Sequence, residues 1–196
     1  MLQKIYLIDY SNKLVNAWKQ VFSSFNNIEV IQGDFFSKQT DAIVSPANSF
    51  GIMDGGLDLA IRHELGFDIE NKVKKSILDK FHGELPVGSA VIVETENKKW
   101  PYLISAPTMR VPENISNTLN PYLAFRAVLL EIIKHNLQSD RKINSLLCPG
   151  LGTGVGQVEP RKCAAHMKIA YMSISKPAHI PSHNEIRKVH KKLLTS

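Results

Sequence analysis

Two glycine-rich loops contain the residues with the clearest chemical potential. One spans Ser45–Gly56 (SPANSFGIMDGG) and the other spans Pro149–Gln157 (PGLGTGVGQ). Glycines let backbone N–H groups approach an anion closely, and the N-terminus of a following helix adds a favourable dipole. Two such loops facing each other would form a slot for a diphosphate. Taken singly, each loop is equally consistent with a tight turn between a strand and a helix.

The spacing of these glycines argues against the commonest nucleotide-binding motifs. No Gly-Lys-Ser/Thr follows either loop, and Gly152-x-Gly154-x-Gly156 differs from the Gly-x-Gly-x-x-Gly dinucleotide fingerprint. The sequence also has no Gly-x-Ser-x-Gly nucleophile elbow. A P-loop NTPase, a Rossmann dehydrogenase and a serine hydrolase are therefore disfavoured.

Asp58 is the carboxylate best placed for chemistry, because it falls in the first turn of the helix predicted after the first loop. There the helix dipole stabilises a negative charge by about 0.3–1 kcal/mol. We therefore expect an ionised carboxylate at neutral pH, suited to orienting a water or stabilising an oxocarbenium-like transition state. The alternative is simple stabilisation of the helix N-terminus, with Arg62 as an i+4 partner.

Cysteine and histidine offer a weaker candidate. Cys163 and His166 lie one helical turn apart, and Cys148 ends the preceding predicted strand, so three zinc ligands could meet. Cys163 also shares the apolar face of its helix with Met167 and Ala170. We therefore predict core packing and no metal.

The elements that position these residues alternate between strand and helix. Short apolar runs separated by helical periodicities indicate an α/β fold with a mixed or largely parallel sheet covered on both faces. The predicted strands are Ile5–Ile8, Ile28–Ile31, Asp41–Ser45, Ser89–Val93, Tyr102–Ala106 and Ser145–Cys148. The predicted helices cover Leu14–Phe25, Leu57–Leu65, Ile69–Phe81, Tyr122–Leu137 and a last segment after Pro160.

Length and composition fit one domain with an appendage. The 196 residues are 43% hydrophobic, which is enough for one folded domain. Two prolines follow Ser173, so we predict that the domain covers residues 1–172 and that residues 173–196 form an extended basic tail. The net charge of +6 suits anionic ligands and makes nucleic acid a possible partner. Two cysteines and no long apolar run lead us to expect a cytoplasmic protein with no membrane partner.

Read together in order and spacing, several short motifs resemble the macro domain family of ADP-ribose-binding modules. They run from Gly33 to the last predicted helix and are Gly33-Asp34-Phe35, Asp41–Asn48 (DAIVSPAN), Asp54–Asp58 (DGGLD), Gly83-Glu84, Tyr102–Pro107 and Gly152–Val155 (GTGV). The Met-Asp-Gly-Gly run at residues 53–56 is similar to a bacterial or phage-associated branch. The resemblance implies a three-layer α/β/α fold.

The resemblance also implies a role for each matching residue. Asp34 would accept a hydrogen bond from the adenine amino group, with the Phe35 backbone beside it, and Asn48 would hold the hydroxyls of the distal ribose. Asp58 would act near the anomeric carbon. The diphosphate would lie between two sets of glycine-loop residues, namely Gly55 and Gly56 in the first loop and Gly152, Thr153, Gly154, Val155 and Gly156 in the second.

Two positions depart from the family pattern. The first glycine of the family's triplet is Asp54 here, and we expect its side chain to face away from the diphosphate and to cap the helix at Leu57. An aromatic residue that often lies beside the distal ribose is replaced by Gly156 or Gln157. The resemblance thus implies binding of ADP-ribose or a derivative, with hydrolysis at the distal ribose and no cofactor. A non-catalytic reader and a nucleic-acid binder are the alternatives, and an ADP-ribosylated protein is a further possible partner.

Overall fold

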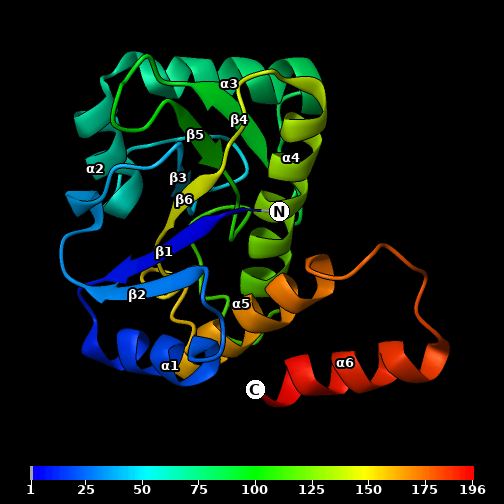
Figure 1. Cartoon of the computed structure of the whole chain (residues 1–196). Helices are drawn as coiled ribbons and strands as arrows, with labels where there is room; N and C mark the ends of the chain where they lie inside the picture. The colour runs from blue at the N-terminus through cyan, green and yellow to red at the C-terminus, as the bar shows by residue number, and fades with distance from the viewer. Residues whose placement is uncertain (1) are drawn as a thin grey trace.

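A six-stranded sheet forms the centre of the computed structural model, which describes residues 2–196 (Figure 1). Its strands are β1 (Lys4–Asp9), β2 (Ile28–Gln32), β3 (Ala42–Ser45), β4 (Val91–Glu94), β5 (Tyr102–Ser105) and β6 (Ser145–Cys148). The order is β2-β1-β6-β3-β5-β4, and only β4 runs antiparallel to its neighbour. The mixed, largely parallel sheet predicted from the apolar strands is therefore confirmed.

Helices cover both faces of the sheet, which gives three layers. The helices α1 (Asn12–Phe22), α4 (Asn120–Gln138) and α5 (Pro160–Ile174) share one apolar core with the sheet, whereas α2 (Gly56–Leu65) and α3 (Asp68–Phe81) share the other. Because side chains alternate along a strand, Ala42 and Val44 of β3 face the first core and Ile43 faces the second. Both cores are fully buried at their centres.

The carboxyl ends of β2, β1, β6, β3 and β5 lie at one edge of the sheet, since these strands are parallel. Ligands of open α/β sheets bind in loops at this edge. Three of the loops that leave this edge carry candidate residues: the one that leads to the short 3-10 helix η1 (Phe35–Ser37), the loop from β3 to α2, and the loop from β6 to α5. The fold thus brings to one edge the two glycine-rich loops and the loop that carries Asp34.

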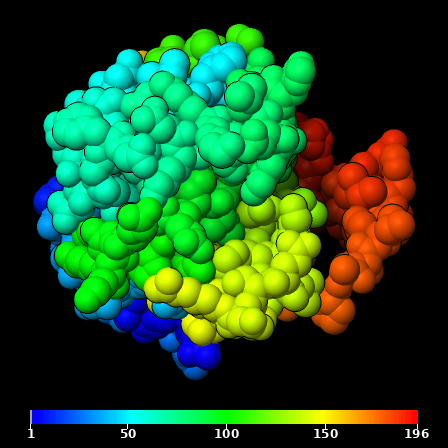
Figure 2. All heavy atoms as spheres, turned by 90° about the horizontal axis from the view of Figure 1, so that it is seen from above, coloured from blue at the N-terminus to red at the C-terminus, as the bar shows by residue number. Residues whose placement is uncertain are grey.

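The end of the chain differs from the prediction of an extended tail. After α5 and a linker, residues His183–Thr195 form a further helix, α6, which Figure 2 shows as a separate lobe beside the body. Ser182 and Glu185 close a capping box at its start. At its other end Leu193 is buried, and its carbonyl accepts a hydrogen bond from His166 Nε2 at 2.8 Å. Within residues 2–196, none of the helices is both long and apolar enough to span a bilayer.

Candidate functional site

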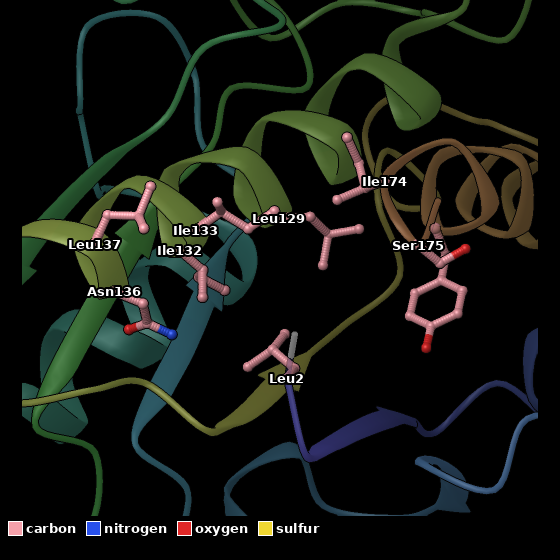
Figure 3. A pocket seen from close by; sticks show the side chains of 9 residues that line it. Leu2, Leu129, Ile132, Ile133, Asn136, Leu137, Ile174 and Ser175 are labelled. Atoms are coloured by element: carbon pink, nitrogen blue, oxygen red, sulfur yellow. The ribbon is translucent and has the colours of Figure 1, made fainter. Parts of the chain in front are cut away.

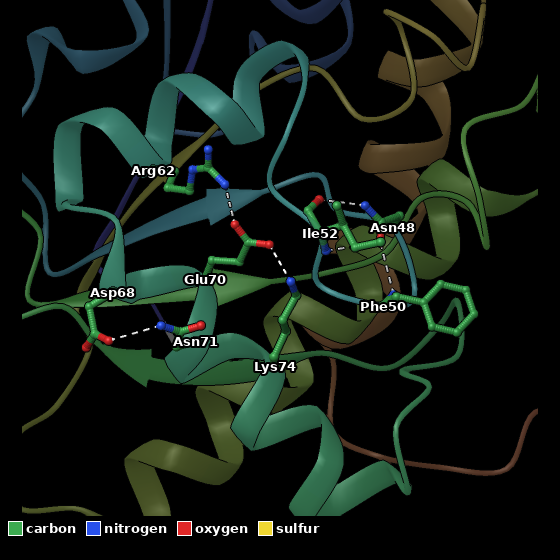
Figure 4. A network of polar contacts seen from close by, with 8 residues as sticks. All are labelled: Asn48, Phe50, Ile52, Arg62, Asp68, Glu70, Asn71 and Lys74. Carbon is green, nitrogen blue, oxygen red and sulfur yellow. Dashed lines mark hydrogen bonds and ion pairs between the residues drawn. The ribbon is translucent and has the colours of Figure 1, made fainter.

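Asn48 organises the β3–α2 loop from within. Its Oδ1 accepts hydrogen bonds from the backbone N–H of Phe50 (3.0 Å) and of Ile52 (3.3 Å), and its Nδ2 donates to the Ile52 carbonyl at 2.7 Å (Figure 4). An amide nitrogen has two hydrogens, so one donor of Asn48 is left for a ligand. The side chain therefore shapes the loop and can still contribute to a site.

Asp58 lies in the first turn of α2, as predicted, but burial changes its electrostatics. The side chain is 9% exposed, and its Oδ1 accepts a short hydrogen bond from the Ser45 hydroxyl. Burial raises the pKa of Asp58 from 3.8 to about 6; the Ser45 hydrogen bond opposes this rise, while the charges of Asp54 and Glu70 add to it. The carboxylate is mostly ionised at pH 7, but less strongly than the helix dipole alone predicts.

Neither of the two contacts expected at the start of α2, Arg62 with Asp58 and Asp54 with the helix N-terminus, is present in the structure. Arg62 does not pair with Asp58; its guanidinium forms a short ion pair with Glu70 of α3, which Lys74 also contacts (Figure 4). Asp54 is exposed, and the N-cap of α2 is Gly55, without a side-chain hydrogen bond. The expectation that Asp54 caps this helix is therefore wrong. The Arg62–Glu70 pair instead joins α2 to α3, and the Lys74–Glu70 pair lies within α3.

The β6–α5 loop is held by its own backbone. Val158 N–H donates to the Gly152 carbonyl (3.0 Å) and Gln157 N–H donates to the Gly154 carbonyl (2.9 Å). Gly152 has a φ of +73°, and a Cβ at Gly156 would lie 2.5 Å from the Gly152 carbonyl oxygen. These two glycines are thus required by the turn itself, whatever they bind.

Two sets of backbone N–H groups are left without acceptors at this edge. Within residues 2–196, the N–H groups of residues 153–156 donate no hydrogen bond, and neither do those of residues 55–58 at the start of α2. The strands β3 and β6 that lead into the two loops are parallel neighbours, with Ile43 opposite Leu147. The two loops therefore start side by side, with Gly55, Gly154 and Val155 exposed.

Asp34 lies at the end of β2, farther along the same edge. Its Oδ1 accepts a hydrogen bond from Phe36 N–H at 3.0 Å and caps η1, so this side chain has a structural role in the turn. The Asp34 side chain is exposed, whereas Phe35 is 5% exposed and packs in the core. Only the backbone of Phe35 is available to a ligand beside Asp34.

The thiols and His166 do not converge. Cys148 and Cys163 are fully buried, and Cys163 Sγ contacts the Leu151 carbonyl at 3.5 Å while His166 contacts Leu193. The prediction that Cys163 packs in the core is confirmed. In the described part of the chain, no three histidine, cysteine or acidic side chains are grouped to hold a metal.

An apolar cavity of about 170 Å³ lies away from these loops (Figure 3). Its lining comes from the start of the chain and from the C-terminal halves of α4 and α5, and includes Leu2, Ile132 and Ile174. Because Leu2 precedes β1, the cavity is at the amino edge of the sheet. The carboxyl-edge loops, rather than this cavity, are the candidate site.

Sequence reasoning missed Ser45, the residue that contacts Asp58. It appeared in the matched motif without a role of its own. Strand alternation places its side chain on the face of Ile43, toward α2, and that signal could have singled it out.

Comparison with known proteins identifies the family. The family model described as "Macro domain" matches residues 44–167. The chain belongs to the macro domain family. The matched region starts in β3, so Asp34 and Phe35 lie outside it.

Relatives of this macro domain cover most of its length. An uncharacterised protein of Aquifex aeolicus is 34% identical over 143 residues, which are 73% of this chain and 79% of that one. Among solved structures, the macrodomain of Mycobacterium tuberculosis DarG has a TM-score of 0.61 at 21% identity, covering 74% of this chain and 89% of that one. A glycine-to-valine variant of the Oceanobacillus iheyensis macrodomain, solved with ADP-ribose, has a TM-score of 0.60 at 21% identity and covers 82% and 88%.

Proposed function

We propose that this macro domain binds ADP-ribose or a close derivative along the carboxyl edge of its sheet. The unpaired N–H groups of residues 55–58 and 153–156 carry the proposal, because they present two neighbouring sets of donors to a diphosphate. Asp34 would take the adenine end and Asn48 the distal ribose. They follow β2 and β3, which are three strand spacings, about 14 Å, apart.

The Oceanobacillus macrodomain structures support this placement. That protein has been solved with ADP-ribose and with ADP. Its variants replace an asparagine, a glycine seven residues later and an aspartate ten residues after the asparagine. Asn48, Gly55 and Asp58 have the same spacing here.

We further infer that the bound molecule is hydrolysed at its distal ribose. Ionised Asp58 would accept a hydrogen bond from a water and orient it toward the anomeric carbon, while the remaining N–H of Asn48 holds a ribose hydroxyl. In a derivative linked at that carbon, the water oxygen bonds to the carbon as the bond to the leaving group breaks. Asp58 takes the proton of the water, and the leaving group, a modified side chain or a phosphate, departs with the bonding electron pair and is protonated in turn. Positioning and electrostatics would supply the rate enhancement.

Isothermal titration of ADP-ribose tests the binding part. We expect micromolar binding by the native protein and a loss of at least about tenfold in Asp34→Ala, which removes one hydrogen-bonded contact from an exposed position. Equal affinity of the two proteins, or no heat from either, would contradict the proposed orientation.

Turnover of an ADP-ribosylated peptide and of ADP-ribose 1″-phosphate separates an enzyme from a reader. Asp58→Asn keeps the shape of the side chain and the acceptor for Ser45 but removes the charge. A hydrolase loses turnover in this variant and retains ADP-ribose affinity. A reader consumes neither substrate in either form.

Nucleic acid is the second candidate partner, and one observation favours it. Residues 173–196 contain five basic residues and one acidic residue, a net +4 of the chain's +6, and most of them lie on α6. Binding through this helix would fall steeply with salt and would not depend on Asp34.

A further inference from the structure

Ser45 is the last residue of β3 and is 1% exposed. Its hydroxyl donates to Asp58 Oδ1 across the packed interface between the sheet and α2. Within residues 2–196, this is the one side-chain hydrogen bond that Asp58 accepts, and Oδ2 accepts none. One oxygen of the carboxylate is therefore held while the other is left for a different partner.

The neighbouring strand provides an internal comparison. Ser105 is paired with Ser45 in the β3–β5 register and is also 1% exposed. Its hydroxyl has no hydrogen-bond partner among the described residues. Two serines of equal burial on adjacent strands are thus distinguished by a hydrogen bond to Asp58, which Ser45 makes and Ser105 does not.

The surroundings of Asp58 make that contact necessary for a charged carboxylate. The acidic groups that act on it are Asp54 from its own loop and Glu70 from α3, and both oppose its ionisation. The cations Arg62 and Lys74 are engaged by Glu70. Burial further disfavours the charge, so among the side chains that the structure describes the Ser45 hydroxyl is the one that stabilises the ionised form.

We propose that Ser45 is a positioning residue for Asp58, holding Oδ1 against β3 so that Oδ2 faces the water or ribose hydroxyl of the bound ligand. The proposal rests on the proposed function in that it assigns Asp58 to the ligand. It assigns no contact between Ser45 and the ligand itself. Ser45 acts through Asp58 alone.

The direct test is the titration of Asp58 in the ligand-free protein, followed by the ¹³C chemical shift of its carboxyl carbon. Loss of one hydrogen bond to a charged group predicts that the midpoint rises by about one pH unit in Ser45→Ala. Ser45→Thr, which keeps the hydroxyl, and Ser105→Ala, which removes an unpartnered one, should titrate like the native protein. A native midpoint in Ser45→Ala, or the same rise in Ser105→Ala, overturns the proposal.

Turnover supplies a second readout with a characteristic pH dependence. If the midpoint moves by one unit, the ionised fraction of Asp58 in Ser45→Ala falls about fivefold at pH 6 and little at pH 8. We expect kcat to follow this pattern with KM nearly unchanged, and Ser45→Thr to restore it. A kcat in Ser45→Ala that is native at every pH, or equally reduced at every pH, overturns the positioning role.

The two proposals fail separately. If the native protein turns nothing over, the hydrolase assignment fails, and the carboxyl titration still decides the role of Ser45. If Ser45→Ala does not fold, Ser45→Cys fills the space with a weaker donor. It should then raise the midpoint in the same direction, and a native midpoint in that variant counts against the proposal.

Discussion

At the scale of single residues, Asp58 shows how burial can outweigh a helix dipole. The dipole favours the charged form by about 0.3–1 kcal/mol at a first-turn position. The rise of its pKa from 3.8 to about 6 corresponds to about 3 kcal/mol in the opposite direction. The position of Asp58 in the helix could be predicted from the sequence. Its burial against β3, and the nearby charge of Glu70 on α3, depend on tertiary packing that local spacing does not encode.

This shift predicts that Asp58→Asn stabilises the fold at neutral pH. Because the folded pKa is raised, the ionised form is penalised: the penalty is small below about pH 4, grows between pH 4 and 6, and reaches about 3 kcal/mol above that. Thermal unfolding of the native protein and Asp58→Asn should therefore differ by several degrees at pH 8 and little at pH 4. Asp34→Asn, at an exposed position, is the matched control. Equal melting temperatures at both pH values would show that Asp58 is not penalised by burial.

At the scale of elements, the β6–α5 loop contains two kinds of residue: those that the turn itself requires and those that are exposed. Gly152 and Gly156 are buried against Ile115, whereas Gly154 and Val155 are exposed. Because this loop follows an apolar strand and precedes a helix, its place at the carboxyl edge can be predicted from the sequence. The motif could not separate these two kinds of glycine, because Ile115 belongs to a distant segment of the chain.

Alanine substitutions should separate the two kinds. A Cβ at Gly156 would lie 2.5 Å from the Gly152 carbonyl oxygen and 2.6 Å from Ile115, so Gly156→Ala should destabilise the fold by about 1–3 kcal/mol. A Cβ at Gly154 meets no atom within 4 Å, and its φ is not positive, so Gly154→Ala should leave the free energy of unfolding nearly unchanged. Denaturant unfolding measures both. Similar losses in the two variants would mean that the loop packs differently from the structure.

At the scale of the whole molecule, the order of strands and helices was predictable and the end of the chain was not. Each of the six strands in the structure overlaps a predicted one, because each contains a short apolar or β-branched run. The two prolines at Pro177 and Pro181 masked α6. Two sequence signals of a helix were nevertheless present. Ser182 and Glu185 form a capping box, and apolar residues follow at helical spacing, of which Leu193 is buried and contacts α5.

The position of α6 leads to a prediction that separates its packing from its charge. Figure 1 places α6 on the opposite side of the molecule from α2, and charges are screened over about 8 Å at 0.15 M salt. Removing residues 176–196 exposes the surface that Leu193 covers and should lower the free energy of unfolding by about 1.5–3 kcal/mol. The affinity for ADP-ribose should stay within about twofold of the native value.

A variant with the helix intact isolates the charge. Replacing Arg187, Lys188, Lys191 and Lys192 by Gln keeps Leu193 in place while removing most of the basic residues of the tail. It should unfold at the native temperature and bind ADP-ribose normally, and any salt-dependent nucleic-acid binding through α6 should be lost from it as it is from the truncated chain. Weaker ADP-ribose binding by the Gln variant would instead show that α6 contributes to the site, since its packing is unchanged.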